Sequence, residues 1–163
     1  IILIGILGLA FSIYKLRLLK QYEVETISED GDSITQKMNN AVNEFSNKES
    51  QESSLDEIII NFSSKVEWGN NWVKFFAAVA PLLGLLGTVI GMIETFQAIT
   101  LFGTGDPKLM AGGISQALVT TMLGLIVAAP LLFMHSYAEN YSKSIISFLE
   151  EKASGIVANK TKQ

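Results

Sequence analysis

The chain has 163 residues and a net charge of −4; 48% of its residues are hydrophobic and only 17% are charged. This length allows one domain, and the apolar excess indicates a membrane protein. With no cysteine and one histidine, disulfides, thiolate metal sites and histidine clusters for zinc are excluded, so we expect neither a metal nor a cofactor.

Residues 1–20 are predicted to form the first transmembrane segment. About fourteen apolar residues precede Lys15, fewer than the ~20 that span a bilayer. Since the chain starts inside this run without a methionine, we interpret it as N-terminally truncated or processed. A signal peptide is the alternative, but no basic region precedes the run and no small-residue cleavage site ends it.

Residues 21–72 are acidic, with eleven Asp or Glu against three Lys. We interpret this excess as a solvated face, which argues against nucleic acid or anionic lipid as a partner of the region. The pair Asp32 and Ser33 is a suitable N-cap. An apolar stripe at helical spacing follows it, formed by Ile34, Met38, Val42 and Phe45.

A second helix in this region is predicted to begin at a capping box formed by residues 54–57. Its apolar stripe comprises Leu55, Ile58, Ile59, Phe62 and Val66. No Pro or Gly interrupts the stripe before Gly69, so we expect this helix to run on toward the next apolar segment. The polar stretch SNKESQESS, residues 46–54, is predicted to be a mobile loop between the two helices.

Two long apolar segments follow, at 73–100 and 109–137, and each exceeds the ~20 residues that span a bilayer. Apart from a lysine at its start, the first carries one charged residue, Glu94, and the second carries none. The turn at 101–108 is short, so the segments form a helical hairpin, and residues 138–163 continue as a C-terminal helix or tail. The predicted fold class is an all-α integral membrane protein with three transmembrane helices.

The distribution of basic residues predicts the orientation of the chain. Three of them directly follow the apolar run of the first segment, namely Lys15, Arg17 and Lys20. Others flank the hairpin on the same side, namely Lys65 and Lys74 before it and Lys143 and Lys152 after it. The hairpin turn holds only Lys108, beside Asp106. Because basic residues tend to remain in the cytoplasm, three crossings place the N-terminus in the periplasm and both residues 21–72 and the C-terminus in the cytoplasm.

Small residues line one face of each hairpin helix, which favours close packing of membrane helices. In the first helix the packing residues are Gly84, Gly87 and Gly91, with Thr88 and Thr95 on the Gly84 face. In the second they are Gly113, Ala117, Gly124 and Ala128, with Thr120 among them. Glu94 and Gln116 lie to one side of these lines.

Folding the hairpin at its turn pairs residues whose numbers sum to about 209, so that each pair lies at one depth. Thr88 pairs with Thr121, and Glu94 pairs with Gln116. Six residues separate Thr88 from Glu94, or roughly 9 Å along a helix. The hairpin therefore presents a hydroxyl level near its middle and a carboxyl level in its outer third.

Each of these polar residues has an alternative, structural role. Membrane threonines commonly bond to their own backbone or join helices, and Gln116 is able to join helices as well. Glu94 is able to bridge to Lys108 or to a neighbouring subunit. One hairpin and one further helix cannot enclose a polar path, so we expect assembly, with the path at a subunit junction or on a ring axis.

Two blocks of the hairpin resemble the ExbB/TolQ/MotA family of proton-channel subunits: VAPLLGLLGTVIGMIETFQ (79–97) and GGISQALVTTMLGLIVAAP (112–130). The joining stretch FQAITLFGTGDPKLMAGG is most similar to ExbB proteins of TonB-energising systems, in the branch with a long periplasmic N-terminal extension. The resemblance implies a homo-oligomer, a pentamer, in the bacterial inner membrane. It also implies that the pentamer surrounds single-span ExbD-like helices and acts with a TonB-like protein, without enzyme activity.

The resemblance further implies roles for the polar residues. A membrane aspartate of the ExbD-like partner carries the proton, and Thr88 and Thr121 face the pore beside it. Thr120, Glu94 and Gln116 are further candidates for the proton pathway. Several relatives carry a glutamate where this chain has Gln116, so our hypothesis is that the acid has moved to Glu94 at the same depth.

Other interpretations stay open at this point. Within the family, a TolQ-like or MotA-like stator subunit is an alternative, and outside it a non-conducting structural membrane scaffold is another. An intramembrane hydrolase has little support, because the sequence has no Ser–His pair at one depth, no Asp pair and no metal motif.

Overall fold

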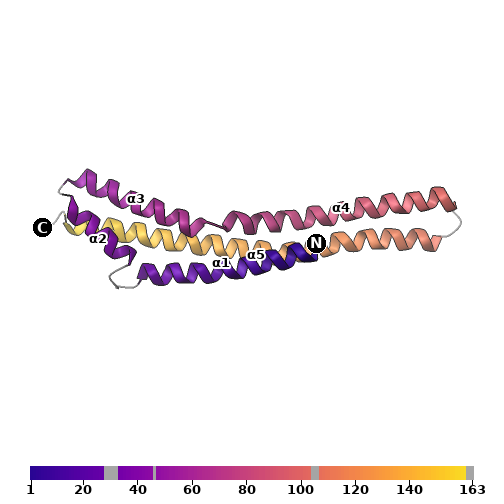
Figure 1. Ribbon diagram of the computed structural model, residues 1–163, viewed down its shortest axis with the longest axis horizontal. Helices are drawn as coiled ribbons and strands as arrows, with labels where there is room; N and C mark the ends of the chain where they lie inside the picture. The colour runs from indigo at the N-terminus through magenta and orange to yellow at the C-terminus, as the bar shows by residue number, and fades with distance from the viewer. Residues whose placement is uncertain (28–32, 46, 104–106, 161–163) are drawn as a thin grey trace. The chain divides into compact units, whose positions relative to one another are not determined.

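The computed structural model describes residues 1–27, 33–45, 47–103 and 107–160 of the chain. Five α-helices follow one another: α1 (Ile2–Ile27), α2 (Ile34–Glu44), α3 (Lys48–Glu67), α4 (Asn70–Phe102) and α5 (Pro107–Lys160) (Figure 1). The described ranges contain no strand. Three helical stretches, which include α1, α4 and α5, are long and apolar enough to cross a membrane. The predicted all-α membrane fold with three spanning helices is confirmed.

The described helices divide between two compact units, and α1, α4 and α5 contribute to both. Residues 1–13 and 71–135 form the first, which we call the hairpin unit. Residues 14–70 and 136–163 form the second, which we call the head unit.

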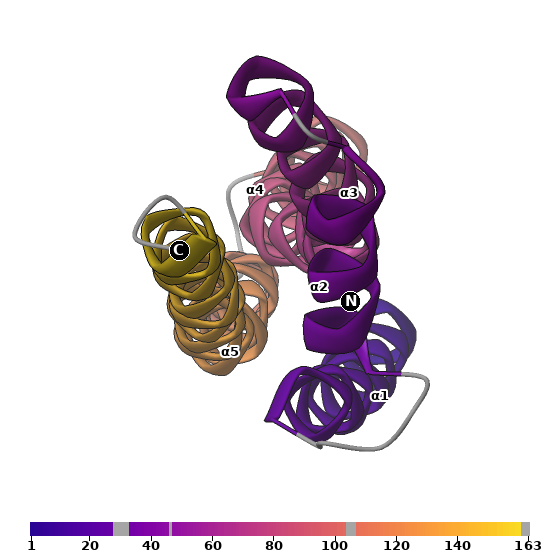
Figure 2. The same ribbon diagram turned by 90° about the vertical axis from the view of Figure 1, so that its left-hand side faces the viewer.

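In the hairpin unit, α4 and α5 run side by side in opposite directions (Figures 1 and 2). Glycines allow their backbones to approach closely. A Cβ atom added at Gly124 would lie 2.8 Å from the Ala80 carbonyl oxygen and 3.1 Å from the Cα atom of Gly84. Because a backbone atom cannot move aside as a flexible side chain can, only glycine fits here without displacing a helix.

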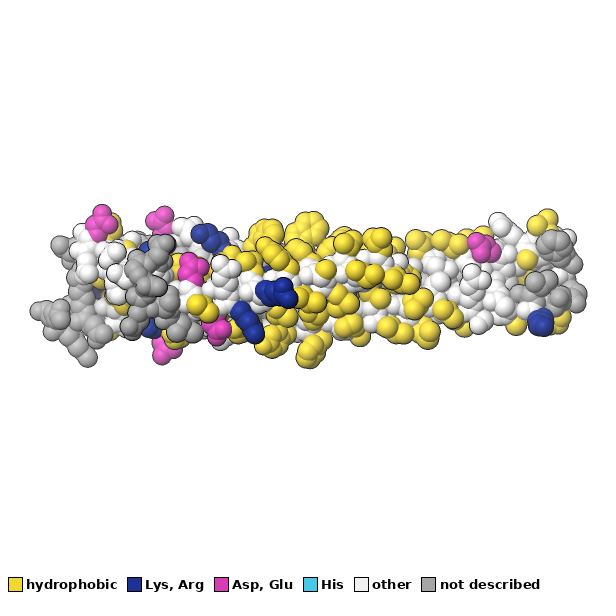
Figure 3. All heavy atoms as spheres, turned by 60° about the horizontal axis from the view of Figure 1, so that its bottom comes forward, with side chains coloured by type: hydrophobic (Ala, Val, Ile, Leu, Met, Phe, Trp, Pro, Cys, Tyr) yellow, Lys and Arg dark blue, Asp and Glu magenta, His cyan; other side chains and the backbone are white. Residues whose placement is uncertain are grey.

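The membrane part of α1 also packs closely at its glycines in the hairpin unit. A Cβ atom at Gly5 would lie 2.8 Å from a methyl group of Val127, and one at Gly8 would lie 2.9 Å from a methyl group of Leu131. The Gly8 position also contacts Phe76 on α4. Many large apolar side chains are exposed on the unit, among them Leu82, Phe96 and Phe133. Figure 3 shows apolar side chains gathered on the face that it draws, as expected of helices that face lipid or other subunits.

The head unit has its own hydrophobic core, to which α1, α2, α3 and α5 contribute. Leu19, Met38, Val66 and Leu149 are completely buried in it. The predicted apolar stripes face this core, since Ile34, Met38 and Val42 of α2 and Leu55, Phe62 and Val66 of α3 are buried. Phe45, by contrast, is the C-cap of α2 and is exposed. Ser33 caps α2 as predicted, accepting a hydrogen bond from the Gln36 amide.

The predicted start of the second helix was wrong. α3 begins at Lys48, six residues before the expected capping box, and residues 48–53 are helical rather than a loop. Asn47 supplies the N-cap by accepting a hydrogen bond from the Glu49 amide. The Gln51 side chain donates to the Phe45 carbonyl at 2.6 Å, which fixes the first turn of α3 against the end of α2.

α3 does not run on unbroken into α4. It ends at Glu67, Trp68 is its C-cap, and Gly69 has a φ of 88°. This left-handed conformation is accessible to glycine at little cost. The next residue, Asn70, starts α4.

Candidate proton pathway in the membrane hairpin

Contacts between α4 and α5 define how the two helices are aligned. The glycine positions place Gly84 beside Gly124, Gly91 beside Ala117, and Gly113 beside the hydroxyl of Thr95. The residue numbers in each of these pairs sum to 208. Thr88 with Thr121 and Glu94 with Gln116 differ from this alignment by one or two residues, so each pair lies at nearly one level of the hairpin.

The threonine hydroxyls donate hydrogen bonds to backbone carbonyls. Thr88 Oγ1 donates to Leu85 of its own helix at 2.6 Å. Thr121 Oγ1 reaches across to the Gly84 carbonyl at 3.0 Å. Thr120 Oγ1 donates to Ala117 at 2.6 Å and lies 3.3 Å from the same Gly84 carbonyl. Each hydroxyl oxygen keeps lone pairs that can accept a further hydrogen bond.

On α4, the polar residues lie on opposite sides of the face that contacts α5. Successive residues of an α-helix are ~100° apart around its axis. Measured from the line through Gly84 and Gly91, Thr88 lies about 50° to one side and Glu94 about 70° to the other. A single chain therefore directs its hydroxyl and its carboxyl away from each other.

On α5 the angles around the helix axis are measured from the line through Ala117 and Gly124. Thr121 lies about 50° to one side, while Thr120 and Gln116 lie about 50° and 90° to the other. Because the two helices are antiparallel, the same sense of rotation leads to the same edge of the hairpin.

The five candidate residues thus fall on two opposite edges. Thr88 and Thr121 form what we call the threonine edge. Glu94, Gln116 and Thr120 form what we call the acid edge. The contact between Gly87 and the Thr120 side chain agrees with this assignment, because Gly87 also lies about 50° toward the acid edge.

Helix α1 packs on the acid edge. Its contact residues Phe76 on α4 and Val127 on α5 both lie about 70° from the α4–α5 contact lines, on the same side as Glu94. The threonine edge is therefore the edge of the hairpin opposite α1 within the hairpin unit.

Glu94 and Gln116 are exposed on the single chain, and Thr88 and Thr121 are half-buried. The described residues show no hydrogen bond between Glu94 and Gln116, nor one between Thr88 and Thr121. Leu85 and Leu125 are more than half exposed and lie beside the threonines on their edge. Each edge therefore presents polar groups within an apolar surface that the chain does not itself enclose.

The described part of the chain brings together no group of three or more His, Asp or Glu side chains that could hold a metal ion. What the hairpin offers is hydroxyl, carboxyl and carboxamide groups at membrane depth. Such groups in a membrane helix mark helix contacts or ion pathways.

Comparison with known families decides between general classes of membrane protein. Residues 25–151 match the model of the MotA/TolQ/ExbB proton channel family. The chain belongs to this family. The resemblance inferred from the two hairpin blocks is thereby confirmed, and the family is one of proton channels rather than of enzymes.

Several curated relatives carry the ExbB name. A putative biopolymer transport protein ExbB homolog of Methanothermobacter thermautotrophicus is 40% identical over 93 residues, which cover 57% of this chain and 33% of that protein. The biopolymer transport protein ExbB of Xanthomonas campestris is 30% identical over 103 residues, covering 63% of this chain and 41% of that protein. The match therefore covers between 33% and 41% of the length of these two relatives.

Proposed function

We propose that the chain is a proton-conducting subunit of an inner-membrane motor, and that the threonine edge lines its proton path. Family membership and the geometry of Thr88 and Thr121 support this proposal. The observation that carries it is their position: two hydroxyls at one level, on the edge opposite α1, within an apolar surface. Hydroxyls can accept and pass on a proton without holding a charge.

The proton also needs a group that binds it for longer than a hydroxyl does. We propose that an ExbD-like single-span partner supplies a membrane aspartate against the threonine edge. Thr88 donates its own proton to Leu85 at rest, so its oxygen is free to accept a hydrogen bond from the protonated aspartate. A proton would move onward if Thr88 Oγ1 took up the aspartate's proton while the hydroxyl gave its own proton to a neighbouring acceptor such as a water molecule. Rotation of the hydroxyl would then restore its starting orientation.

Enclosing such a path requires more than one copy of the chain. We propose a homo-oligomer, a pentamer, whose threonine edges face the partner helices and whose apolar outer surface faces the bilayer. The N-terminus lies in the periplasm and the C-terminus in the cytoplasm of a bacterium, because basic residues follow the first segment and flank the hairpin on one side. The motor energises a TonB-like protein and hence outer-membrane transport.

One observation favours a second candidate function, that of a non-conducting scaffold. Thr88, Thr120 and Thr121 all donate to backbone carbonyls, and the Thr121 bond joins two helices. Helix joining of this kind is a sufficient role for membrane threonines. TolQ-like and MotA-like stators are further alternatives within the family.

Proton flux into vesicles separates conduction from a scaffold role. The full chain and its ExbD-like partner are reconstituted together, a proton gradient is imposed, and a pH-sensitive dye reports the internal pH. We expect flux only when both proteins are present. The scaffold role is supported instead if the complex assembles and its flux equals that of empty vesicles.

A further inference from the structure

A lysine side chain is buried in the head unit at the break between α3 and α4. Lys15 of α1 is only 1% exposed. Its ammonium group donates to the Val66 carbonyl at 2.6 Å and also to the Trp68 carbonyl. These carbonyls belong to the last turn and C-cap of α3, where the helix dipole favours a positive charge.

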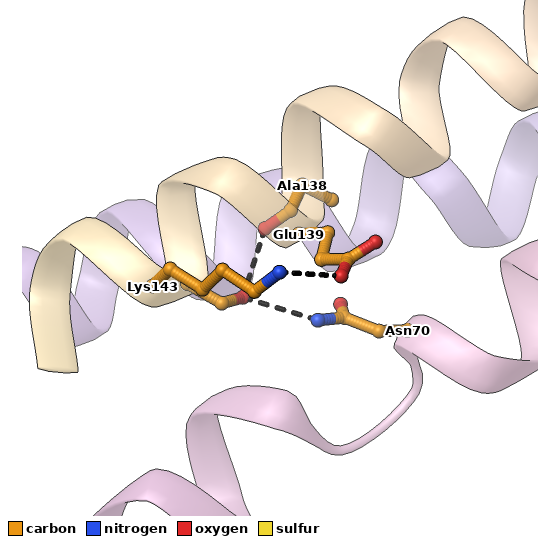
Figure 4. Close-up of polar contacts among 5 residues, drawn as sticks. Asn70, Ala138, Glu139 and Lys143 are labelled. Carbon is orange, nitrogen blue, oxygen red and sulfur yellow. Dashed lines mark hydrogen bonds and ion pairs between the residues drawn. The ribbon is translucent and has the colours of Figure 1, made fainter.

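Polar groups from two other helices meet at the same place. Asn70, the first residue of α4, donates from its amide to the Ser142 hydroxyl of α5 at 3.2 Å. Ser142 donates to the Ala138 carbonyl at 2.8 Å and lies 3.4 Å from the Val66 carbonyl that Lys15 binds. Figure 4 shows Asn70 directed at α5 beside the Glu139–Lys143 ion pair. The break is thus held from α1 and from α5.

The carbonyls that Lys15 binds are those that an unbroken helix would use. In a continuous helix each amide bonds to the carbonyl four residues earlier. The Val66 carbonyl would then accept from the Asn70 amide, and the Trp68 carbonyl from the Trp72 amide. In the broken form, the first amides of α4 have no partner within their own helix.

The chain has no sequence barrier to the unbroken form. Gly69 adopts a φ of 88° here, but glycine also enters right-handed helix at a cost of only about 1 kcal/mol relative to alanine. No proline lies between Lys48 and Val79. The broken form therefore depends on contacts from elsewhere in the chain. The buried ammonium of Lys15 supplies two charge-assisted hydrogen bonds, which are stronger than bonds between neutral groups.

We propose that the hydrogen bonds of Lys15 stabilise two separate helices, α3 and α4, relative to one continuous helix through residues 48–102. Lys15 competes with the amides of Asn70 and Trp72 for the same two carbonyls. Ser142 and Asn70 support the broken form from the other side. Lys15 thus fixes the end of α3 within the head unit, and this role does not require that the chain conduct protons.

Hydrogen exchange in the full chain, measured by mass spectrometry in lipid nanodiscs, tests this proposal. In Lys15→Met, a buried side chain of similar length replaces the ammonium, and the continuous helix becomes accessible. We expect the amides of residues 70–72 to exchange about tenfold more slowly, as a tenfold shift in the opening equilibrium would give. Lys15→Arg keeps the charge and the donors and should retain the wild-type rate.

A second variant favours the continuous helix without changing Lys15. Gly69→Ala disfavours the left-handed conformation and should also slow exchange at residues 70–72, even if Lys15→Met does not fold. A merely structural lysine predicts the opposite result, because its loss would loosen the joint. Faster or unchanged exchange at these amides in folded Lys15→Met, or in Gly69→Ala, would overturn the proposal.

Discussion

The hydroxyl of Thr121 donates a hydrogen bond to the carbonyl of Gly84 across the membrane hairpin, at 3.0 Å. The bond forms where the two backbones approach closely, since a Cβ atom at Gly84 would lie 3.0 Å from the Cα atom of Thr121. The glycine that permits close packing thus also brings a polar group of α5 to the threonine edge. Packing and the proposed proton path depend on the same contact.

Gly124→Ala is expected to destabilise the hairpin. Its new methyl group would lie 2.8 Å from the Ala80 carbonyl oxygen, so a helix must shift, at a cost of about 1–3 kcal/mol. Thermal unfolding in detergent, followed by circular dichroism, measures the loss. Gly112→Ala is the matched control, because nothing lies within 4 Å of its Cβ position. Equal stability of the two variants would contradict the described α4–α5 contact.

Asn47→Ala is expected to destabilise the head unit, whereas Ser54→Ala is not. Asn47 caps α3 through the Glu49 amide, and loss of such a cap costs about 0.5–2 kcal/mol. Ser54 lies inside α3, where alanine has the higher helix propensity. Urea unfolding of the detergent-solubilised chain, monitored by Trp fluorescence, compares them. The reverse order of stability would contradict the cap at Asn47 and would support the predicted helix start at residues 54–57.

Glu94→Gln is expected to leave proton flux within about twofold of wild type, because glutamine keeps hydrogen-bonding atoms of the same reach. In addition, Glu94 lies away from the proposed proton path, because it is on the acid edge, on the side of the hairpin where α1 packs. Loss of flux in Glu94→Gln, with assembly intact, would return the acid to the proton pathway, as the hypothesis of an acid moved from position 116 requires.

How far the sequence could predict this molecule depends on the range of the interactions involved. The hairpin and its small-residue contacts could be predicted from local composition. The Ser33 cap could be predicted as well, because its partner is the amide of a residue nearby in the sequence. The start of α3 was misplaced because two capping signals compete, and the Gln51 bond to Phe45 favours the earlier one. That bond joins two helices, so a pattern within one helix could not reveal it.

The division into two edges and the break at Gly69 required the structure for different reasons. Helical spacing alone separates Thr88 from Glu94, but their edges are defined only once Gly84 and Gly91 are known to face α5. The break depends on Lys15, which lies 51 residues before Val66. In the sequence, Lys15 signals membrane orientation and nothing about α3.

The central claim is that protons pass along the threonine edge, and flux through Thr88 variants tests it most directly. In vesicles that contain the chain and its ExbD-like partner, Thr88→Val removes the hydroxyl with little change of shape, and Thr88→Ser keeps it. We expect Thr88→Val to lower flux by about tenfold or more, equivalent to about 1.4 kcal/mol in the barrier, and Thr88→Ser to stay near wild type. Full flux in Thr88→Val, with the complex assembled, would contradict the account.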